Sequence, residues 1–127
     1  MEIKSKQYGS LNDAFEYGDV QIWYAKPDAP FGLKFGLASA KVGNCVPDIN
    51  DLSKSHILLG SISMGERSME DVFTSFQGEC WSPYGEAREL IRSRGLGHTS
   101  MSVGDLIVRD GKVLMVDSRG FTELGDV

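Results

Sequence analysis

The chain has 127 residues, of which 41% are hydrophobic and 24% charged, with a formal net charge of −5. This length and composition predict a single globular domain that buries about two-thirds of its unfolded surface. The negative charge argues against binding to nucleic-acid polymers, because proteins that bind them carry a basic surface. No apolar run reaches the roughly 18 residues of a membrane span, and the first residues lack the apolar core of a secretory signal.

Cys45 and Cys80 have neither a CxxC spacing nor histidines nearby. This argues against a disulfide scaffold and a zinc site, so we expect no cofactor, no metal and a reducing cytoplasm. All the arginines fall in the second half of the chain, at positions 67, 88, 92, 94, 109 and 119. This distribution reflects either chance and solvated helix faces, or a small anionic ligand or partner, because guanidinium groups grip phosphates bidentately.

The first half of the chain consists of short apolar runs broken by glycine and proline. Residues 20–25 ("VQIWYA") are rich in β-branched and aromatic side chains and predict a strand, which Lys26-Pro27 ends. Residues 32–38 ("GLKFGLA") predict a second strand. Residues 44–55 ("NCVPDINDLSKS") predict a loop with one helical turn.

The second half begins with an apolar run at residues 56–63 ("HILLGSIS"), which predicts a buried strand. Ser68, followed by Glu70 and Asp71 in a first turn, predicts a capped helix over residues 69–77. The apolar positions of that helix share one face at spacings of three and four; they are Met69, Val72, Phe73 and Phe76.

Residues 82–95 predict another helix. Ser82 is the expected N-cap, Pro83 suits the first helical position and Gly95 suits the left-handed residue that ends a helix. Arg88 and Arg92, four residues apart, share a face. The positions expected to face the core are Ala87, Leu90 and Ile91.

Residues 98–103 ("HTSMSV") are expected to run extended to a turn at Gly104-Asp105. Residues 105–116 then predict a hairpin around Asp110-Gly111, a pair that tolerates the positive φ angles of a type I′ turn. Both hairpin strands are apolar on both faces, which predicts a central place in the sheet, and residues 120–124 ("GFTEL") complete it. The fold class is therefore α+β, a mainly antiparallel sheet with two helices on one face and a C-terminal β-hairpin.

Catalysis has little support in the sequence. His98, Ser100, Ser102 and Asp105 are the residue types of a hydrolytic triad, but side chains of one extended segment point to alternating faces, whereas a triad converges from separate segments. The sequence contains no nucleophile elbow, P-loop or dinucleotide-binding motif, and its two histidines lack metal-ligand spacing. We therefore expect a protein that is not an enzyme.

Binding has better support. The hydroxyls of Thr99, Ser100 and Ser102 lie beside backbone that can cradle oxyanions, although they can also satisfy backbone groups of the loop. Trp81 and Tyr84 flank the expected helix start, where they can stack on a ring near the positive end of the helix dipole. The alternative for Trp81 is a place in the core.

The segments "SMEDVFTSFQGECWSPYGEARELIRSRGLGHTSMSVGDLIV" and "VDSRGF" resemble the Thoeris anti-defence sponge family of phages, and more broadly the YodL-like accessory proteins of mobile elements. The resemblance covers residues 55–124, while residues 1–54 match nothing. Members of the sponge family sequester cyclic nucleotide signals made by bacterial Toll/interleukin-receptor-type enzymes without degrading them. They assemble from homodimers, with ligand near the subunit interface.

The resemblance implies a counter-defence protein of the host cytoplasm that sequesters a cyclic ADP-ribose-like, or cyclic oligonucleotide, immune signal. The alternative is a YodL-like interaction module that inhibits or assists a host or element-encoded protein. For the first function, aromatic rings would stack on base or ribose, arginines would meet phosphates and hydroxyls would bond riboses. The residues expected to contact the ligand are Trp81, Tyr84, Arg88, Arg92, His98, Thr99, Ser100, Ser102, Arg109 and Arg119.

We also expect a homodimer or larger homo-oligomer. A domain this small offers few deep concave sites, and two-fold pairing is the commonest closed symmetry. Trp23, Tyr24, Phe31 and Phe35 are candidate interface residues, because aromatic side chains are enriched at subunit interfaces. The alternative is that they complete the core.

Overall fold

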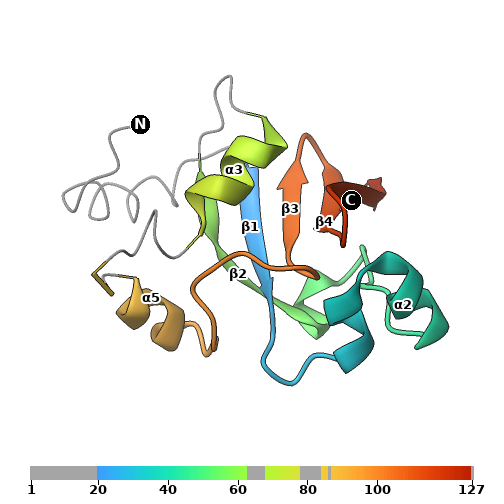
Figure 1. The fold of residues 1–127 in the computed structure, drawn as a ribbon, viewed down its shortest axis with the longest axis horizontal. Coiled ribbons are helices and arrows are strands. Elements are labelled where there is room, and N and C mark those ends of the chain that lie inside the picture. The colour runs from blue at the N-terminus through green and yellow to red at the C-terminus, as the bar shows by residue number, and fades with distance from the viewer. Residues whose placement is uncertain (1–19, 63–67, 78–83, 86, 127) are drawn as a thin grey trace.

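A computed structural model of the chain describes residues 20–62, 68–77, 84–85 and 87–126. Its elements follow in the order β1 (Val20–Ala25), η1 (Phe31–Phe35), α2 (Leu37–Val42), η2 (Leu52–Lys54), β2 (His56–Ile62), α3 (Met69–Ser75), α5 (Arg88–Ser93), β3 (Leu106–Arg109), β4 (Lys112–Val116) and β5 (Phe121–Asp126), as Figure 1 shows.

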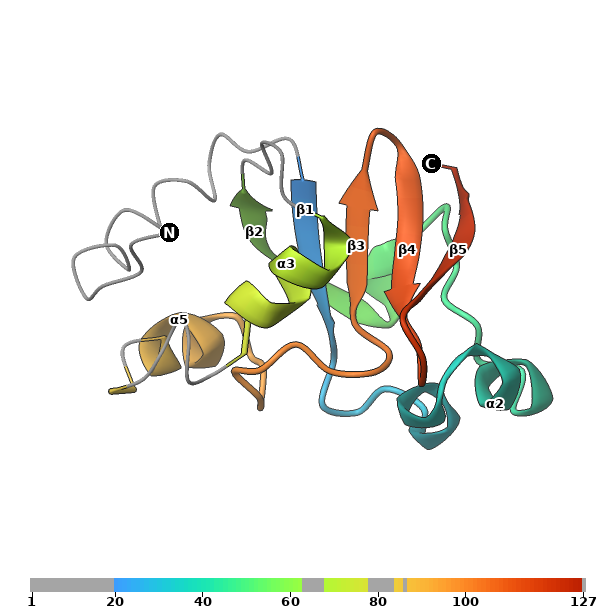
Figure 2. The same cartoon turned by 45° about the horizontal axis from the view of Figure 1, so that its top comes forward.

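The strands form one antiparallel sheet of five strands in the order β2-β1-β3-β4-β5 (Figure 2). The predicted α+β class with a mainly antiparallel sheet is confirmed. β1 pairs with β2 through Val20 and Ile62, and with β3 through Val20 and Arg109. β3 is therefore the middle strand, as the two-sided apolar character of the hairpin predicts. Asp110 and Gly111 have φ angles of 53° and 79°, as a type I′ turn requires.

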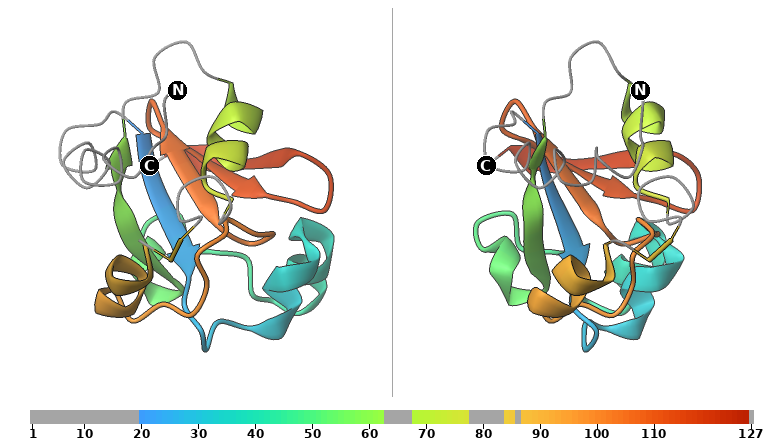
Figure 3. Two further views of the ribbon diagram at one scale, coloured as in Figure 1. Left: turned by 60° about the vertical axis from the view of Figure 1, so that its left-hand side comes forward. Right: turned by 90° about the vertical axis from the view of Figure 1, so that its left-hand side faces the viewer.

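Alternate residues of β1 face two separate hydrophobic clusters. Ile22 and Tyr24 join a cluster to which α3 and α5 contribute Val72 and Ile91. Ala25 faces the other cluster, which η1, α2 and η2 complete with Leu33, Ala40 and Leu52. The two predicted helices thus cover one face, and segments of the first half cover the opposite face. In the left view of Figure 3, α5 and α2 lie on opposite sides of the molecule.

The strand predicted for residues 32–38 is wrong, because this segment forms η1 and the start of α2. Leu33, Leu37 and Ala40 recur at spacings of four and three, which is a helical period, and they pack together in the second cluster. Gly36, with φ of 106°, separates the two helical pieces. The loop with a helical turn at residues 44–55 is confirmed, because η2 lies within it. β2 forms where predicted but is an edge strand, and Leu58 is exposed on it.

Helix α3 begins as predicted. The Asp71 backbone N–H donates to Ser68 Oγ and the Ser68 N–H donates to Asp71 Oδ2, both at 3.1 Å, which completes a capping box.

Helix α5 begins later than predicted. Gly85 has φ of 85°, which a helix interior excludes, and the helix starts at Arg88. Ser82 and Pro83, its expected first residues, lie outside the described residues. Its expected end is confirmed, because Gly95 has φ of 73°.

The aromatic residues of the first half divide between core and surface. Tyr24 is fully buried, so its expected place at an interface is wrong and it completes the core. Trp23 is half-buried against the second cluster. Phe31 and Phe35 are 70% and 58% exposed and meet edge to face, with ring centroids 5.0 Å apart.

Candidate functional site

Residues 97–105, here the 97–105 loop, connect α5 to β3 and end in a buried carboxylate. Asp105 is 1% exposed, and its oxygens accept from the backbone N–H groups of Ala25 and Ser102 at 2.8 and 2.7 Å. His98 Nε2 lies 3.1 Å from Asp105 Oδ2. The loop bends at Thr99 and Ser100 instead of running extended, so His98 and Asp105 meet although the sequence places them on alternating faces. The carboxylate thereby ties the loop to β1.

Ser102 does not complete a hydrolytic triad with this contact. In a triad the histidine accepts from a nucleophilic hydroxyl. Here the Ser102 hydroxyl donates to the Ser100 carbonyl at 3.1 Å, and the Ser102 N–H serves Asp105. Ser102 therefore satisfies backbone groups of its own loop, as the alternative interpretation of the hydroxyls predicts.

Tyr24 and His56 complete the buried support of the loop. The Tyr24 hydroxyl donates to the Thr99 carbonyl at 2.8 Å, and its ring stacks on His98 with centroids 4.6 Å apart. His56 Nε2 lies 2.7 Å from the Gly104 carbonyl, and Nδ1 lies 2.7 Å from Ser55 Oγ. Because a carbonyl only accepts, His56 Nε2 carries the proton and Nδ1 accepts from Ser55.

Both groups are neutral in the folded protein at neutral pH. Burial is the main cause that lowers the pKa of His56 below its ordinary value of 6.5. Burial, together with the charge of Asp105, raises the pKa of Tyr24 well above its ordinary range. The Asp105 carboxylate, its three donors and these two side chains hold the loop from inside.

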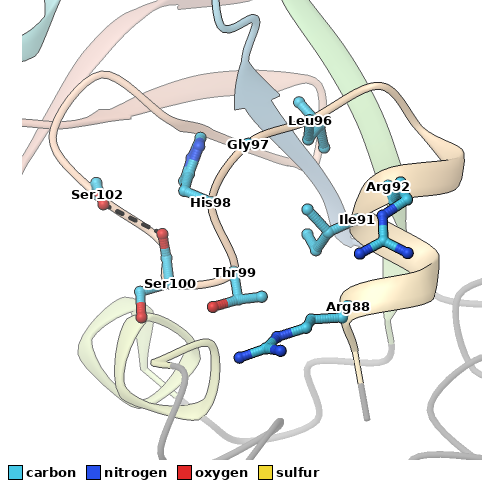
Figure 4. A pocket seen from close by; sticks show the side chains of 9 residues that line it. All are labelled: Arg88, Ile91, Arg92, Leu96, Gly97, His98, Thr99, Ser100 and Ser102. Atoms are coloured by element: carbon cyan, nitrogen blue, oxygen red, sulfur yellow. Dashed lines mark hydrogen bonds between the residues drawn. The ribbon is translucent and has the colours of Figure 1, made fainter. Parts of the chain in front are cut away.

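The outer side of the loop faces a cavity of about 490 Å³, here the α5 cavity, shown in Figure 4. It brings together six of the ten residues expected to contact a ligand: Arg88, Arg92, His98, Thr99, Ser100 and Ser102. Ile91, Leu96 and Gly97 complete its lining. Arg88 and Arg92 come from successive turns of α5, and in Figure 4 both side chains extend from the helix toward the segment that contains Thr99.

The arginines of the α5 cavity are available to a ligand. Both side chains are exposed, and within the described ranges neither forms an ion pair. Ile91 and Leu96 are buried and supply an apolar floor beneath the charged groups. The arrangement suits a ligand with an anionic part and a flat, less polar part.

The other expected ligand residues lie elsewhere. Trp81 is outside the described residues. Tyr84 is 87% exposed and does not line the α5 cavity. Arg109 lies at the opposite end of β3, with its Nε 3.6 Å from Asp110 Oδ2. Arg119 is exposed in the turn between β4 and β5 and also lies outside this cavity.

Sequence reasoning missed Tyr24 and His56 as supports of the loop. They lie 75 and 48 residues from Thr99 and Gly104, the residues they hold, so no local pattern connects them. The only sequence signal for these two residues is a polar ring within an apolar strand. This signal does not identify the residue that the ring contacts.

Comparison with known protein families, curated proteins and solved structures finds no match for this chain. No helix in the described part of the chain is long and apolar enough to cross a membrane. Among those same residues, no group of three or more His, Cys, Asp or Glu side chains is placed to hold a metal ion. Cys45 is a free, partly buried thiol, and Cys80 lies outside the described ranges.

Proposed function

We propose that the α5 cavity binds a cyclic nucleotide signal of the cyclic ADP-ribose type and holds it without converting it. The observation that carries this proposal is the convergence of Arg88 and Arg92 with the His98–Ser102 segment around one cavity. Its volume of about 490 Å³ falls within the range of small-molecule sites, roughly 300–1,000 Å³.

Each part of such a ligand has a suitable neighbour in the cavity. The guanidinium groups of Arg88 and Arg92 present forked donors to a pyrophosphate. Thr99 and Ser100 lie where ribose hydroxyls can bond, and Ile91 and Leu96 offer an apolar surface to a base. His98 and Asp105 contact each other as part of the support of the loop. This role favours a protein that holds its ligand over one that uses these groups for acid–base catalysis.

In biological terms, we propose a phage or mobile-element protein that removes an immune signal from the host cytoplasm. This part of the proposal rests on the resemblance of residues 55–124 to the sponge family. The negative charge of the whole chain makes the local cluster of arginines selective for a small anion, since a long polyanion would meet repulsion beyond the cavity.

Calorimetric titration with cyclic ADP-ribose isomers and cyclic oligonucleotides tests the proposal. We expect saturable binding of at least one of them, with the ligand recovered unchanged by chromatography. Arg88→Gln with Arg92→Gln should weaken binding by about ten- to a hundredfold, the range for lost charge-assisted hydrogen bonds.

The matched control is Arg109→Gln with Arg119→Gln, which removes the same charge outside the α5 cavity and should change affinity by less than about threefold. No heat with any of these compounds contradicts the proposal. Ligand recovered in a chemically altered form makes the protein an enzyme.

We also propose that the chain forms a homodimer through the surface that contains Phe31 and Phe35. These rings are 70% and 58% exposed, whereas apolar side chains this large are usually covered. Val42 and Val46 of the following segment are exposed as well.

Light scattering at micromolar concentration should give the mass of a dimer, and Phe35→Glu should shift it toward a monomer. Tyr84→Glu, which adds the same charge at another exposed aromatic residue away from this surface, is the control and should leave the mass unchanged. A monomeric wild-type mass refutes the dimer. In that case a stoichiometric partner captured from lysate, and lost with Phe35→Glu, supports the YodL-like interaction module.

A further inference from the structure

A second cavity, of about 400 Å³, lies on the other side of the 97–105 loop. It shares Gly97, His98 and Ser102 with the α5 cavity, so the same loop forms a wall of both. Its remaining walls come from the first half of the chain and include Lys26 and Lys34. We call it the lysine cavity.

Backbone contacts fix the positions of both lysines. The Lys26 N–H donates to the Ser55 carbonyl at 2.9 Å, which fixes the residue that follows β1. Lys34 follows Leu33, which is buried against Gly104, since a Cβ added to Gly104 would lie 3.1 Å from the Leu33 side chain. Lys26 and Lys34 thus line one cavity from separate segments of the chain.

The charge of the lysine cavity favours an anion. Within the part of the chain that the structure describes, neither Lys26 nor Lys34 has an ion-pair partner. The opposing carboxylate is that of Asp105, which is 1% exposed and already accepts from two backbone N–H groups and faces His98. These backbone donors stabilise the Asp105 carboxylate without cancelling its charge, so the two lysines leave the cavity with a net positive charge.

We propose that the lysine cavity is a second anion-binding site that takes a phosphate group. An ammonium is a compact charge with rotatable donors and binds phosphate oxygens without a fixed orientation. The site rests on Lys26 and Lys34 and does not depend on the function proposed for the α5 cavity. The phosphate belongs either to the ligand of the α5 cavity, as a second anionic group that crosses the loop, or to a separate molecule.

Inorganic pyrophosphate, titrated calorimetrically into the full chain at low ionic strength, is the probe. Lys26→Gln with Lys34→Gln should weaken the binding that persists in the Arg88→Gln, Arg92→Gln background by about tenfold or more. The matched control is Lys41→Gln with Lys112→Gln, which removes two lysine charges outside both cavities and should change affinity by less than about threefold.

A thermal melt of each variant within a few degrees of the wild type confirms that all of them fold. Equal weakening by the lysine variant and its control overturns the site, because binding then follows net charge alone. Pyrophosphate binding that the lysine variant leaves unchanged overturns it as well.

The source of the phosphate is decided by a titration with cyclic ADP-ribose. If one ligand reaches both cavities, the lysine variant lowers its affinity at unchanged stoichiometry, and saturation with it blocks pyrophosphate. If the sources are separate, pyrophosphate still binds to the nucleotide-saturated protein. Either result supports the second site. Failure of the nucleotide to bind contradicts the proposed function and leaves the pyrophosphate test to decide the lysine cavity.

Discussion

The two sides of the 97–105 loop differ in how their polar groups are satisfied. On the side toward the sheet, Asp105, His56 and Tyr24 are buried and bonded within the fold. On the side toward α5, Arg88 and Arg92 are exposed and, within the described residues, form no ion pair. One short sequence thus has its polar groups bonded within the fold on one side and faces exposed arginines on the other. A hydroxyl-rich motif and the arginines beside it therefore need not have the same role.

Replacing Asp105 should destabilise the protein more than any other change on the side of the loop toward the sheet. Asp105→Ala leaves the backbone N–H groups of Ala25 and Ser102, and His98, without their acceptor. We expect a loss of about 3 kcal/mol in the free energy of unfolding, measured by urea denaturation, because each buried donor left without an acceptor costs about 1–3 kcal/mol. Asp105→Asn, which keeps one acceptor oxygen, should lose less. A loss below about 1 kcal/mol for Asp105→Ala would mean that other residues, and not Asp105, hold the loop in place.

The next effect is a loss of stability in mild acid. Burial lowers the pKa of His56 in the folded state, whereas the unfolded chain takes up a proton near the ordinary value of 6.5. As pH falls below that value, the unfolded state gains a proton that the folded state excludes, so stability falls until the lowered folded-state pKa is reached. The slope is at most about 1.4 kcal/mol per pH unit for one proton.

The measurement compares urea denaturation of the wild type and His56→Gln between about pH 7 and about pH 5. The glutamine can still donate to the Gly104 carbonyl but does not titrate, so its profile should be flatter. Parallel profiles would mean that His56 is not the group responsible.

A smaller effect is expected at Tyr24. Tyr24→Phe removes the hydroxyl that donates to the Thr99 carbonyl and keeps the ring that stacks on His98. We expect a loss of about 1 kcal/mol, typical of one hydrogen bond. Tyr24→Leu, which also removes the stack, should lose more. If the two variants are equally stable, the ring contributes nothing through its contact with His98.

The smallest change in stability is expected for the arginines on the side of the loop toward α5. Arg88→Gln with Arg92→Gln should change the free energy of unfolding by no more than about 0.5 kcal/mol, because exposed side chains without ion pairs contribute little to stability. Calorimetric melting of this variant beside Asp105→Ala separates the two sides of the loop. A large loss of stability would make these arginines part of the fold.

The features predictable from sequence are those fixed by residues close together in the chain. The capping box of Ser68, the turn at Asp110-Gly111 and the end of α5 at Gly95 each depend on a few neighbouring residues. The shared face of Arg88 and Arg92 follows from their spacing, and their nearness to Thr99 follows from the short segment between them.

What the sequence could not predict depends on residues far apart. Asp105 meets the backbone of Ala25, 80 residues away, and the lysine cavity joins Lys26 to the same loop. All the arginines lie in the second half of the chain, but this distribution does not show which of them line the cavity. Arg88 does, whereas Arg109 lies at the other end of β3. The segment at residues 32–38 forms helical turns because its apolar residues, at a helical spacing, pack together in the second cluster. Neither its two glycines nor Phe35 reveals that packing in the sequence.

The position of β1 between β2 and β3 has a consequence for how the chain folds. Val20 must find Arg109, almost the whole described length away, before the sheet has its middle strand. Closing so long a loop costs conformational entropy before the contacts between β1 and β3 form. We therefore expect folding on a timescale of milliseconds to seconds and not of microseconds. During synthesis, β1 has only β2 beside it until β3 leaves the ribosome, and its other edge is exposed to pairing with foreign strands for that whole interval.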